Sequence, residues 1–493
     1  MNPTNGTLDL MKQALGTRSD DLSKSITTGT GLVAYDLQAP AKNLYPVYTP
    51  LRNSIPRVGG GVGTATNWRQ VSAIIGSGYD NSGWVPEGQR AGAMSYTTAT
   101  IAASYVTFGE EDSVTFQAVA AGKTFEDLKA TMVMRLLQKV MLKEENAIIG
   151  GNKSIALGIP TAPTLTATTV AGATLPALTY SVIVVALTQE GFYNSSLTNG
   201  VGIAKTVTGQ DGATFVINGG ASNQSAATTQ AITLGQTLTC TTPAIRGAVA
   251  WAWFTGASGS ETLQAITTVN TVVFSAPLTS GRQAATAVIA DCSKNATLAF
   301  DGLLTTALNP ANTAYVQTMS GTAGLTSSGR GSVVEIDNAF QYMWDNFQLG
   351  ATVMYVNSQE QKNITTKVMT NASGTLVRYN APAQDMKEPV AIVAGGVVSS
   401  YYNPFTPSGG QIIPIKVHPK VPPGTILMYC EELPIQYQNN EVSNVAEMKM
   451  RTDYFSIDWP LTSLKHCSGC YADGVLAVYC TFAMAVITNI ANA

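Results

Sequence analysis

The chain has little charge. Only 12% of its 493 residues are charged, which is about half the usual share. Hydrophobic residues make up 45% of the chain, so the scarcity of charge does not indicate disorder, because apolar burial can offset the loss of chain entropy. A surface with so few charges is typical of one that other chains cover. The net charge of −3 argues against tight nucleic-acid binding, which needs clustered Lys and Arg.

The sequence also lacks segments that would carry it into a membrane. Residues 1–16 contain no apolar core of signal-peptide length, so we expect a chain that is not exported. The longest apolar run, Val475–Ile487, is shorter than the 18 or more residues of a membrane helix and predicts a buried strand. Six scattered cysteines without an export signal indicate reduced thiols in a cytoplasm.

Residues for chemistry are few. The two histidines, His418 and His466, lie in no serine–aspartate pattern of a catalytic triad. The motif nearest to a metal or redox site is HCSGC, with Cys467 and Cys470, but a structural zinc usually needs a second CxxC or HxxxH pair, which is missing. Zinc, a disulfide and two ordinary thiols in a turn are the alternatives, and we favour the thiols. We expect no enzyme activity, no catalytic residue, no cofactor and no metal.

Two further motifs have structural interpretations. Gly122-Lys123-Thr124 resembles the end of a phosphate-binding loop, but position 117, where that motif begins with glycine, is Gln117. Capping of a helix is therefore the favoured interpretation. Trp251 and Trp253 are two residues apart and share one face of a predicted strand. That spacing favours a place in a β-sandwich over a sugar-stacking platform.

The stretch Lys123–Gly151 organises the chain. It holds nine charged residues and repeats apolar residues every three or four positions, which predicts a helix about 25 residues and roughly 38 Å long. The predicted apolar face consists of Phe125, Leu128, Met132, Leu136 and Val140. Thr124 is the expected N-cap, and Gly150-Gly151 is the expected stop, since glycine tolerates left-handed angles.

Residues 1–58 read as an extended arm. Leu8–Leu15 predicts a short helix, and prolines then exclude regular structure; they are Pro40, Pro46, Pro50 and Pro56. An arm of this length cannot bury itself, so we expect it to lie on the body of its own chain or on a neighbour. A frayed terminus is the alternative for the first 30 residues.

A glycine-rich segment and a long β-hairpin follow the arm. Two strands, Thr66–Ile75 and Thr97–Phe108, flank a segment dense in turn residues. Tyr79 and Trp84 near the tip are candidate contacts with a partner, because an isolated hairpin is marginally stable. The candidate hinge glycines are Gly59, Gly60, Gly61 and Gly63.

Residues 158–291 differ sharply in composition from the rest, with six charged residues between positions 159 and 290. Short strand patterns fenced by Gly, Asn or Ser predict a β-sandwich inserted as a domain. The strands expected are Thr179–Leu187, Ala213–Ile217, Thr237–Thr241, Ala248–Thr255 and Thr271–Phe274. Segments 236–276 and 178–196 resemble fibronectin type III or immunoglobulin-like modules, in swapped order, so that a permuted module and a partial match are both open.

The chain from residue 292 onward predicts an α+β body. Ser332–Glu335 forms a capping box for a helix over Val333–Phe347 that Gly350 would stop, and Asn357-Ser358 would cap a second helix. The other expected elements are a strand at Ala351–Val356, the helix Gln359–Met369, and strands at Val390–Ser399, Gln411–Val417, Thr425–Cys430 and Met448–Ile457.

This order of elements resembles the major capsid proteins of tailed bacteriophages, with their Hong Kong 97-type fold. The resemblance rests on YPVYTPLRNSIPRV, WVPEGQ, KEENAIIGG, VMYVNSQEQ and KVPPGTILM. It implies an N-terminal arm (1–58), an extended loop (59–122), a spine helix and the start of the peripheral domain (123–157), an inserted immunoglobulin-like sandwich (158–291), and peripheral and axial domains (292–493).

The resemblance also implies a function and partners. The chain would assemble with itself, as hexamers and pentamers, into an icosahedral shell around double-stranded DNA, with a portal and scaffold or decoration proteins as further partners and no membrane. Its location would be the virion capsid, assembled in the host cytoplasm, and the inserted domain would bind host-surface glycans. An encapsulin-type nanocompartment shell is the runner-up, and an extracellular adhesin a third alternative.

One property of some relatives is excluded. They join neighbouring subunits by an isopeptide bond from a lysine in the extended loop. This chain has no lysine between Lys42 and Lys123, so its loop cannot supply that bond. We therefore predict a shell stabilised without covalent links.

Overall fold

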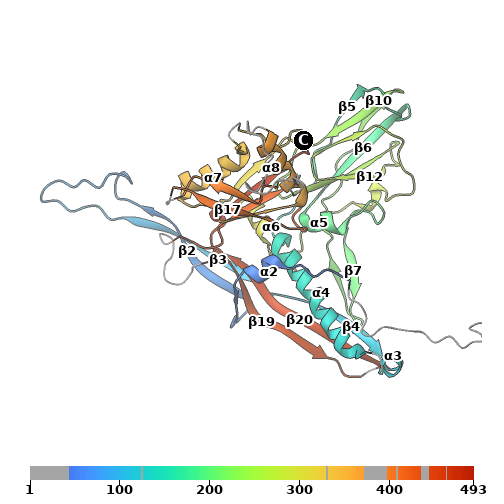
Figure 1. The fold of residues 1–493 in the computed structure, drawn as a ribbon, viewed down its shortest axis with the longest axis horizontal. Helices are drawn as coiled ribbons and strands as arrows, with labels where there is room; N and C mark the ends of the chain where they lie inside the picture. Colours follow the sequence, from blue (N-terminus) through green and yellow to red (C-terminus); the bar gives the residue numbers. More distant parts are fainter. Residues whose placement is uncertain are drawn as a thin grey trace, which may run out of the picture.

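The computed structural model describes residues 44–123, 126–328, 331–370, 397–406, 409–434, 444–461 and 463–492. The fold is α+β and has three parts that are easily told apart in Figure 1: a long ribbon of two strands, a sheet with a long helix along it, and an upper half that combines a mixed layer with a β-sandwich. The expected helix Leu8–Leu15 and most of the expected strand Val390–Ser399 lie outside the described residues.

The long helix α4 (Leu128–Gly150) lies along a sheet of order β1-β19-β20-β4. The strands are β1 (Arg57–Val58), β4 (Val106–Thr115), β19 (Ala446–Asp458) and β20 (Lys465–Val478). Met132, Leu136 and Val140 are buried as predicted, and the latter two pack with Cys470 of β20. The apolar face of the helix therefore holds it to this sheet.

The ends of α4 differ from the prediction. A separate helix, α3 (Phe116–Gly122), comes first, and the predicted cap Thr124 lies outside the described residues. The N-cap is Asp127, whose carboxylate accepts hydrogen bonds from two free amides of the first turn. Gly151 follows the helix as predicted, but its φ is −51°. The expected reason is thus wrong: a side chain there would press on the carbonyl oxygen of Phe300 at 2.7 Å.

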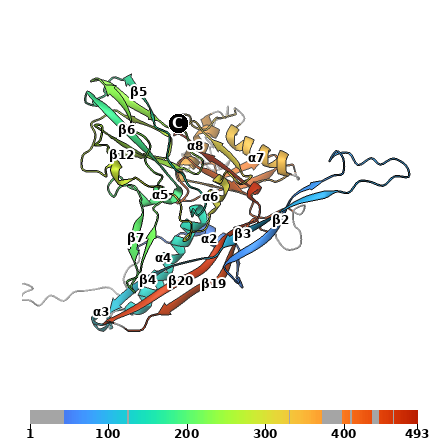
Figure 2. The same ribbon diagram turned by 180° about the vertical axis from the view of Figure 1, so that it is seen from behind.

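The predicted hairpin is confirmed as β2 (Ala65–Ile75) paired antiparallel with β3 (Ser95–Ser104). It points away from the rest of the chain in both views (Figures 1 and 2). The prediction of one strand over Thr97–Phe108 is wrong, because the chain leaves the hairpin after Ser104 and β4 pairs with β20 instead. At the base, the Trp68 ring packs edge-on against Tyr479, with centroids 5.2 Å apart.

Residues 158–291 form two facing sheets, of order β13-β10-β5 and β12-β11-β6-β9. The expected strands exist as β6 (Leu178–Leu187), β8 (Thr214–Ile217), β10 (Gln236–Thr241), β11 (Ala250–Gly256) and β13 (Thr271–Phe274). The sequence reading missed β5 (Thr164–Thr169), β7 (Lys205–Thr208), β9 (Thr228–Ile232) and β12 (Thr262–Thr267). Strands β6 and β11 are buried on both faces, because separate apolar clusters cover their alternating residues. This explains their unbroken apolar sequences.

The two ends of the insertion are tied together. Gly158 N donates to Asp291 Oδ2 at 2.8 Å, and Leu157 N donates to Ser293 Oγ at 2.9 Å. Asn152, which directly follows the α4 stop, donates from Nδ2 to Ser293 O at 2.7 Å. The chain therefore leaves the body and returns to it at one place, as an inserted segment must.

The body contains a six-stranded sheet of order β14-β21-β18-β15-β17-β16. Its strands are β14 (Tyr315–Thr318), β15 (Val353–Val356), β16 (Ser400–Asn403), β17 (Gln411–Val417), β18 (Ile426–Tyr429) and β21 (Met484–Thr488). Helices α7 (Val334–Phe347) and α8 (Ser358–Thr370) cover one face. The other face packs with α6 (Leu303–Leu308) in a cluster that continues into the sandwich. The insertion and the body thus share one core.

Predicted caps in the body had mixed outcomes. Asn357 caps α8 as expected, since its Oδ1 accepts from Gln359 N at 3.1 Å. The capping box at α7 is wrong: Ser332 Oγ donates to Asp337, and Glu335 accepts from Thr326 N instead. The helix ends at Phe347 as predicted, but the residue that follows it in a left-handed conformation is Gln348, with φ 54°, and not Gly350.

Two other expectations need correction. The run Val475–Ile487 is not one buried strand, because a 3₁₀ turn separates β20 from β21 and residues 479–482 are only half-buried. The prolines do not exclude regular structure from the arm either: Pro50 begins a short helix, α2 (Pro50–Ser54), where proline is well tolerated because its missing N–H would be unpaired anyway. None of the helices that the structure describes is both long and apolar enough to span a bilayer.

Candidate assembly surfaces and arm anchor

The tip of the β2–β3 hairpin exposes large apolar side chains. Tyr79 is 87% exposed and Trp84 is 93% exposed, so neither predicted contact residue is covered by its own chain. Other exposed apolar residues continue along the hairpin, namely Val71, Ile74, Ile75, Val85, Met94 and Tyr96. This exposed apolar surface makes the hairpin a candidate contact site for another molecule.

The glycines at the hairpin base differ among themselves. Gly60 and Gly63 have positive φ, of 84° and 77°, which other residues rarely adopt. Gly61 donates from its N to Met450 O at 3.1 Å, and a side chain there would collide with the Tyr105 ring. Gly59 has open space around it. The segment is therefore anchored to β19 at Gly61, and its role as a hinge stays a prediction.

A second, smaller hairpin extends from the insertion. Among the residues that the structure describes, strands β7 and β8 pair only with each other, and they run from the region of α5 (Gln189–Asn194) toward β4 (Figure 1). Three consecutive residues of β8, Phe215, Val216 and Ile217, are exposed. An isolated two-stranded ribbon with apolar residues on both faces needs a covering surface, so this hairpin is a second candidate contact.

The described part of the arm is anchored on its own chain by Glu145 of α4. Its Oε1 accepts from Leu51 N at 3.0 Å, and its Oε2 accepts from Arg52 N at 2.7 Å. These amides belong to the first turn of α2, where helix geometry leaves them without partners, and Thr49 supplies no side-chain cap. A carboxylate from another helix therefore caps α2 and fixes it in place.

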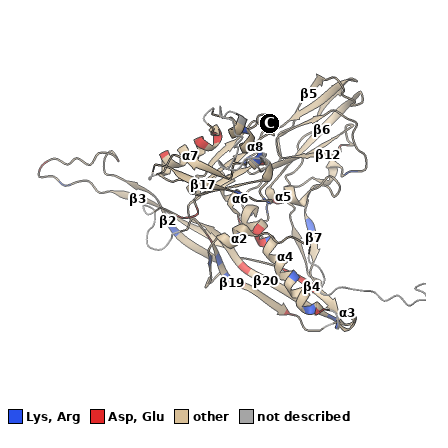
Figure 3. Ribbon diagram, in the orientation of Figure 1, with Lys and Arg blue, Asp and Glu red and all other residues tan. Residues whose placement is uncertain are grey.

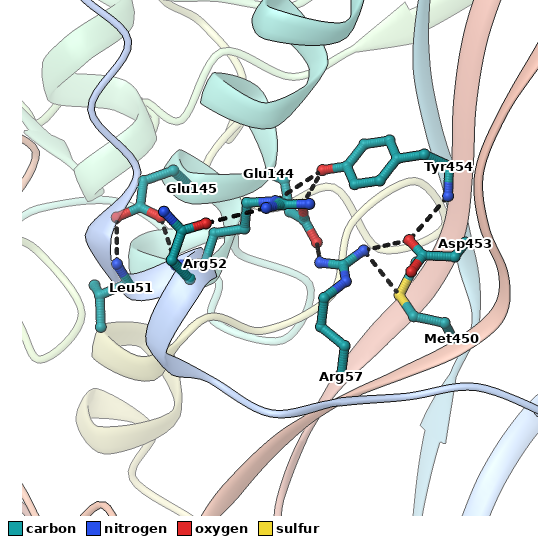
Figure 4. A network of polar contacts seen from close by, with 9 residues as sticks. Leu51, Arg52, Arg57, Glu144, Glu145, Met450, Asp453 and Tyr454 are labelled. Carbon is teal, nitrogen blue, oxygen red and sulfur yellow. Dashed lines mark hydrogen bonds and ion pairs between the residues drawn. The ribbon is translucent and has the colours of Figure 1, made fainter.

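The neighbouring Glu144 binds two arginines of the arm (Figure 4). Its carboxylate accepts from Arg52 Nε at 3.1 Å and from Arg57 Nη1 at 2.5 Å, and also from the Tyr454 hydroxyl of β19. Arg57 in turn contacts Asp453 Oδ1 at 2.6 Å. Burial alone would lower the pKa of Arg57, but Asp453 and Glu144 together raise it, so the guanidinium stays charged. Arm, helix and sheet meet in this network.

Charge is concentrated near this anchor and along α4. Figure 3 shows acidic and basic positions on α4, whereas strands β5, β6 and β12 of the sandwich carry almost none. The sequence assigns the charges of α4 no intramolecular role. Glu144 and Glu145 are instead buried within the chain and bind the arm.

The HCSGC motif has an ordinary structural place. Cys467 and Cys470 lie in strand β20, not in the expected turn, and all six cysteines are free thiols. Cys470 packs against α4, and the His466 ring lies 4.4 Å from the Phe116 ring. Among the described residues, no group of three or more His, Cys, Asp or Glu is placed to hold a metal.

Trp251 and Trp253 belong to the core, as favoured from the sequence. Both are essentially unexposed, and Trp253 Nε1 donates to Thr267 Oγ1 at 2.8 Å. A sugar cannot stack on either ring in this arrangement. Their burial instead joins the sandwich to the shared core.

Sequence reasoning missed the arm anchor. Glu144 and Glu145 were only two of the nine charged residues of the predicted helix, and His418, which contacts Glu145, was given no role. No local signal was available, because Lys143 and Asn146 flank the two glutamates and this part of α4 has the polar residues of an ordinary exposed helix face.

The sequence matches no family model and no curated protein. Several solved structures resemble the fold over most of its length. They include the capsid of Myoviridae phage XM1 (10% identity, 94% of this chain and 99% of that chain, TM-score 0.41), the capsid of a native GTA particle (9%, 94% and 97%, 0.43) and the capsid of cyanophage A-1(L) (10%, 94% and 99%, 0.43). All three are capsid structures.

Proposed function

We propose that this chain is the major capsid protein of a tailed bacteriophage, a structural protein that assembles with itself into the icosahedral shell around the phage's double-stranded DNA. One observation carries the proposal. The β2–β3 hairpin leaves the body of its own chain and presents Tyr79, Trp84 and further apolar side chains to the outside. A protein that worked alone would not keep such an element.

The physical argument is that the hairpin needs a neighbour. Two strands without a covering surface are marginally stable, and burial of apolar area contributes about 25 cal/mol per Å². One aromatic side chain on a neighbour therefore contributes a few kcal/mol. Each contact can be weak, because a closed lattice repeats it around every subunit and the contacts act together.

The proposal extends to the fold type and the domains. A Hong Kong 97-type subunit would use residues 1–58 as arm, 59–122 as extended loop, 123–157 as spine, 158–291 as an immunoglobulin-like insertion, and 292–493 as peripheral and axial domains. The anchored arm, the projecting hairpin and the tied ends of the insertion support this division. Hexamers and pentamers, a portal, and scaffold or decoration proteins belong to the same proposal.

The insertion would lie on the outside of the shell and bind host-surface glycans. Trp251 and Trp253 are buried, so such binding would use other residues of the sandwich. An encapsulin-type compartment ranks second, because the projecting hairpin would serve a shell around protein cargo equally well. An extracellular adhesin ranks below both, since it gives the hairpin no role.

The test is assembly of the purified chain, followed by size-exclusion chromatography and electron microscopy. We expect closed shells from the wild type. Replacing Tyr79 and Trp84 together by Ser should leave a folded but unassembled protein, whereas Val273→Ser, at an exposed apolar site of the sandwich, should assemble normally. A monomeric wild type would contradict the proposal. Particles that protect DNA from nuclease would exclude the encapsulin alternative.

A further inference from the structure

We propose that the insertion positions the N-terminal arm of its own subunit, and that His418 is the positioning residue through which it does so. Helix α5 of the insertion, the turn at residues 418–421, Glu145 of α4 and helix α2 of the arm are joined in one continuous series of hydrogen bonds. This inference goes beyond the proposed shell function and does not depend on it.

The first link joins the insertion to the turn. Tyr193 of α5 donates from its hydroxyl to Pro419 O at 2.8 Å, and Gln189 Nε2 donates to Lys420 O at 3.1 Å. The Lys420 ammonium lies 4.7 Å from the centre of the Tyr193 ring, which adds a cation–π contact. Gln189 also donates to Asn146 of α4 at 3.0 Å. The insertion thus holds the backbone of the turn from one side.

The second link runs through the imidazole of His418, which is fully buried. Its Nδ1 accepts a hydrogen bond from Lys420 N at 3.0 Å. A ring nitrogen that accepts carries no proton, so the proton of the neutral ring is on Nε2. Nε2 therefore donates to Glu145 Oε1 at 2.7 Å. The ring has one partner at each nitrogen, and the position of the turn determines its orientation.

The third link is the cap of the arm. Glu145 is buried and accepts from His418 Nε2, Leu51 N and Arg52 N. Its Oε1 serves both His418 and Leu51, so a shift of the imidazole changes the geometry of the bond to the arm. Because the site is closed to water, each bond lost there leaves a buried donor without a partner.

The shared core makes the coupling mechanical as well as polar. Apolar residues at the end of α4, in α6 and on the inner faces of the sandwich belong to one cluster. The insertion is therefore packed into the subunit and supports it through this core, in addition to any role on the outer surface. A displacement of α5 would therefore also displace the turn at residues 418–421.

The test measures hydrogen–deuterium exchange of the peptide that contains Leu51 and Arg52 in the full chain. Tyr193→Phe removes only the hydroxyl and keeps the ring beneath Lys420. We expect exchange of this peptide to accelerate at least threefold. The matched control is Tyr180→Phe, which removes a hydroxyl that donates to Pro176 O within the insertion, and exchange of the arm should be unchanged.

Two further variants keep the test decisive. Gln189→Leu breaks the other bond to the turn and should also loosen the arm, so it replaces Tyr193→Phe if that variant does not fold. In a His418→Gln background, Tyr193→Phe should have no additional effect on the arm, because the link is already broken. Unchanged arm exchange in both insertion variants would overturn the inference, and so would equal acceleration in Tyr180→Phe.

Discussion

Arg57 offers a controlled comparison of two ion pairs, because the same guanidinium binds two carboxylates (Figure 4). Glu144 lies 2.5 Å away and its side chain is 0% exposed, whereas Asp453 lies 2.6 Å away and its side chain is 57% exposed. Glu144→Gln and Asp453→Asn each remove one negative charge and keep the shape of the side chain. The two variants therefore differ mainly in the burial of the lost charge.

The expected costs differ by more than the distances suggest. In Glu144→Gln, Arg52 and Arg57, which are 17% and 19% exposed, lose their common carboxylate, and an amide N–H₂ faces donors. Removing one partner of a buried pair costs about 3 kcal/mol or more. Asp453→Asn removes a solvated partner, so its cost is at most about 1 kcal/mol.

Native-state hydrogen exchange of the peptide that spans α2 measures this difference locally, without the need for two-state unfolding of the whole chain. Since 1.4 kcal/mol corresponds to a factor of ten, Glu144→Gln should accelerate exchange by roughly 100-fold and Asp453→Asn by less than about fivefold. High salt should reduce the effect of Asp453→Asn and leave that of Glu144→Gln nearly unchanged. Equal acceleration by the two variants would refute the assignment of Glu144 as the buried anchor.

Three other predictions concern pH, the hairpin base and the shell. Burial raises the pKa of Glu190 to about 7, so the free energy of unfolding is highest below pH 4.5 and falls by about 3 kcal/mol as the pH rises from there through 7. Glu190→Gln should abolish this pH dependence in thermal unfolding scans and raise the stability at pH 8. Gly61→Val should displace Tyr105 and give aberrant particles in electron microscopy, whereas Gly59→Val, with open space, should give normal ones. Boiled particles should run as a monomer near 51.7 kDa on a denaturing gel, and a ladder of covalent oligomers would show that links form without a loop lysine.

Elements with local signals were predictable from the sequence. The apolar repeat of α4 and the strand patterns of the hairpin depend on residues a few positions apart, so a single sequence is enough to predict these elements. The two strands with continuous apolar sequences, β6 and β11, were also predicted. The boundaries of the strands were less predictable. Residues 97–108 looked like one strand, but the chain breaks at Tyr105, because the residues that follow form β4 and pair with the distant strand β20.

The caps and the anchor were not predictable, because distant residues decide them. Ser332 and Glu335 have the spacing of a capping box, but Asp337 and Thr326 bind them more favourably in the fold. Glu145 meets Leu51 across 94 positions and His418 across 273. No spacing rule covers such separations, so a buried carboxylate and a surface carboxylate look alike in the sequence.

In the proposed assembly, the anchor would supply the direction that a chain with so little charge otherwise lacks. Apolar contacts are not directional, so exposed side chains such as Trp84 provide adhesion but cannot by themselves set where the hairpin points. Buried charges have a single satisfied geometry, and a wrong register of the arm would leave Glu144 or Glu145 unpaired at a cost of several kcal/mol. Arg57, near the end of the arm, lies four residues before Gly61, which is bound to β19. The polar anchor therefore fixes the chain close to the point where the hairpin leaves the body, and under the proposed function the hairpin would contact the neighbour that lies in that direction.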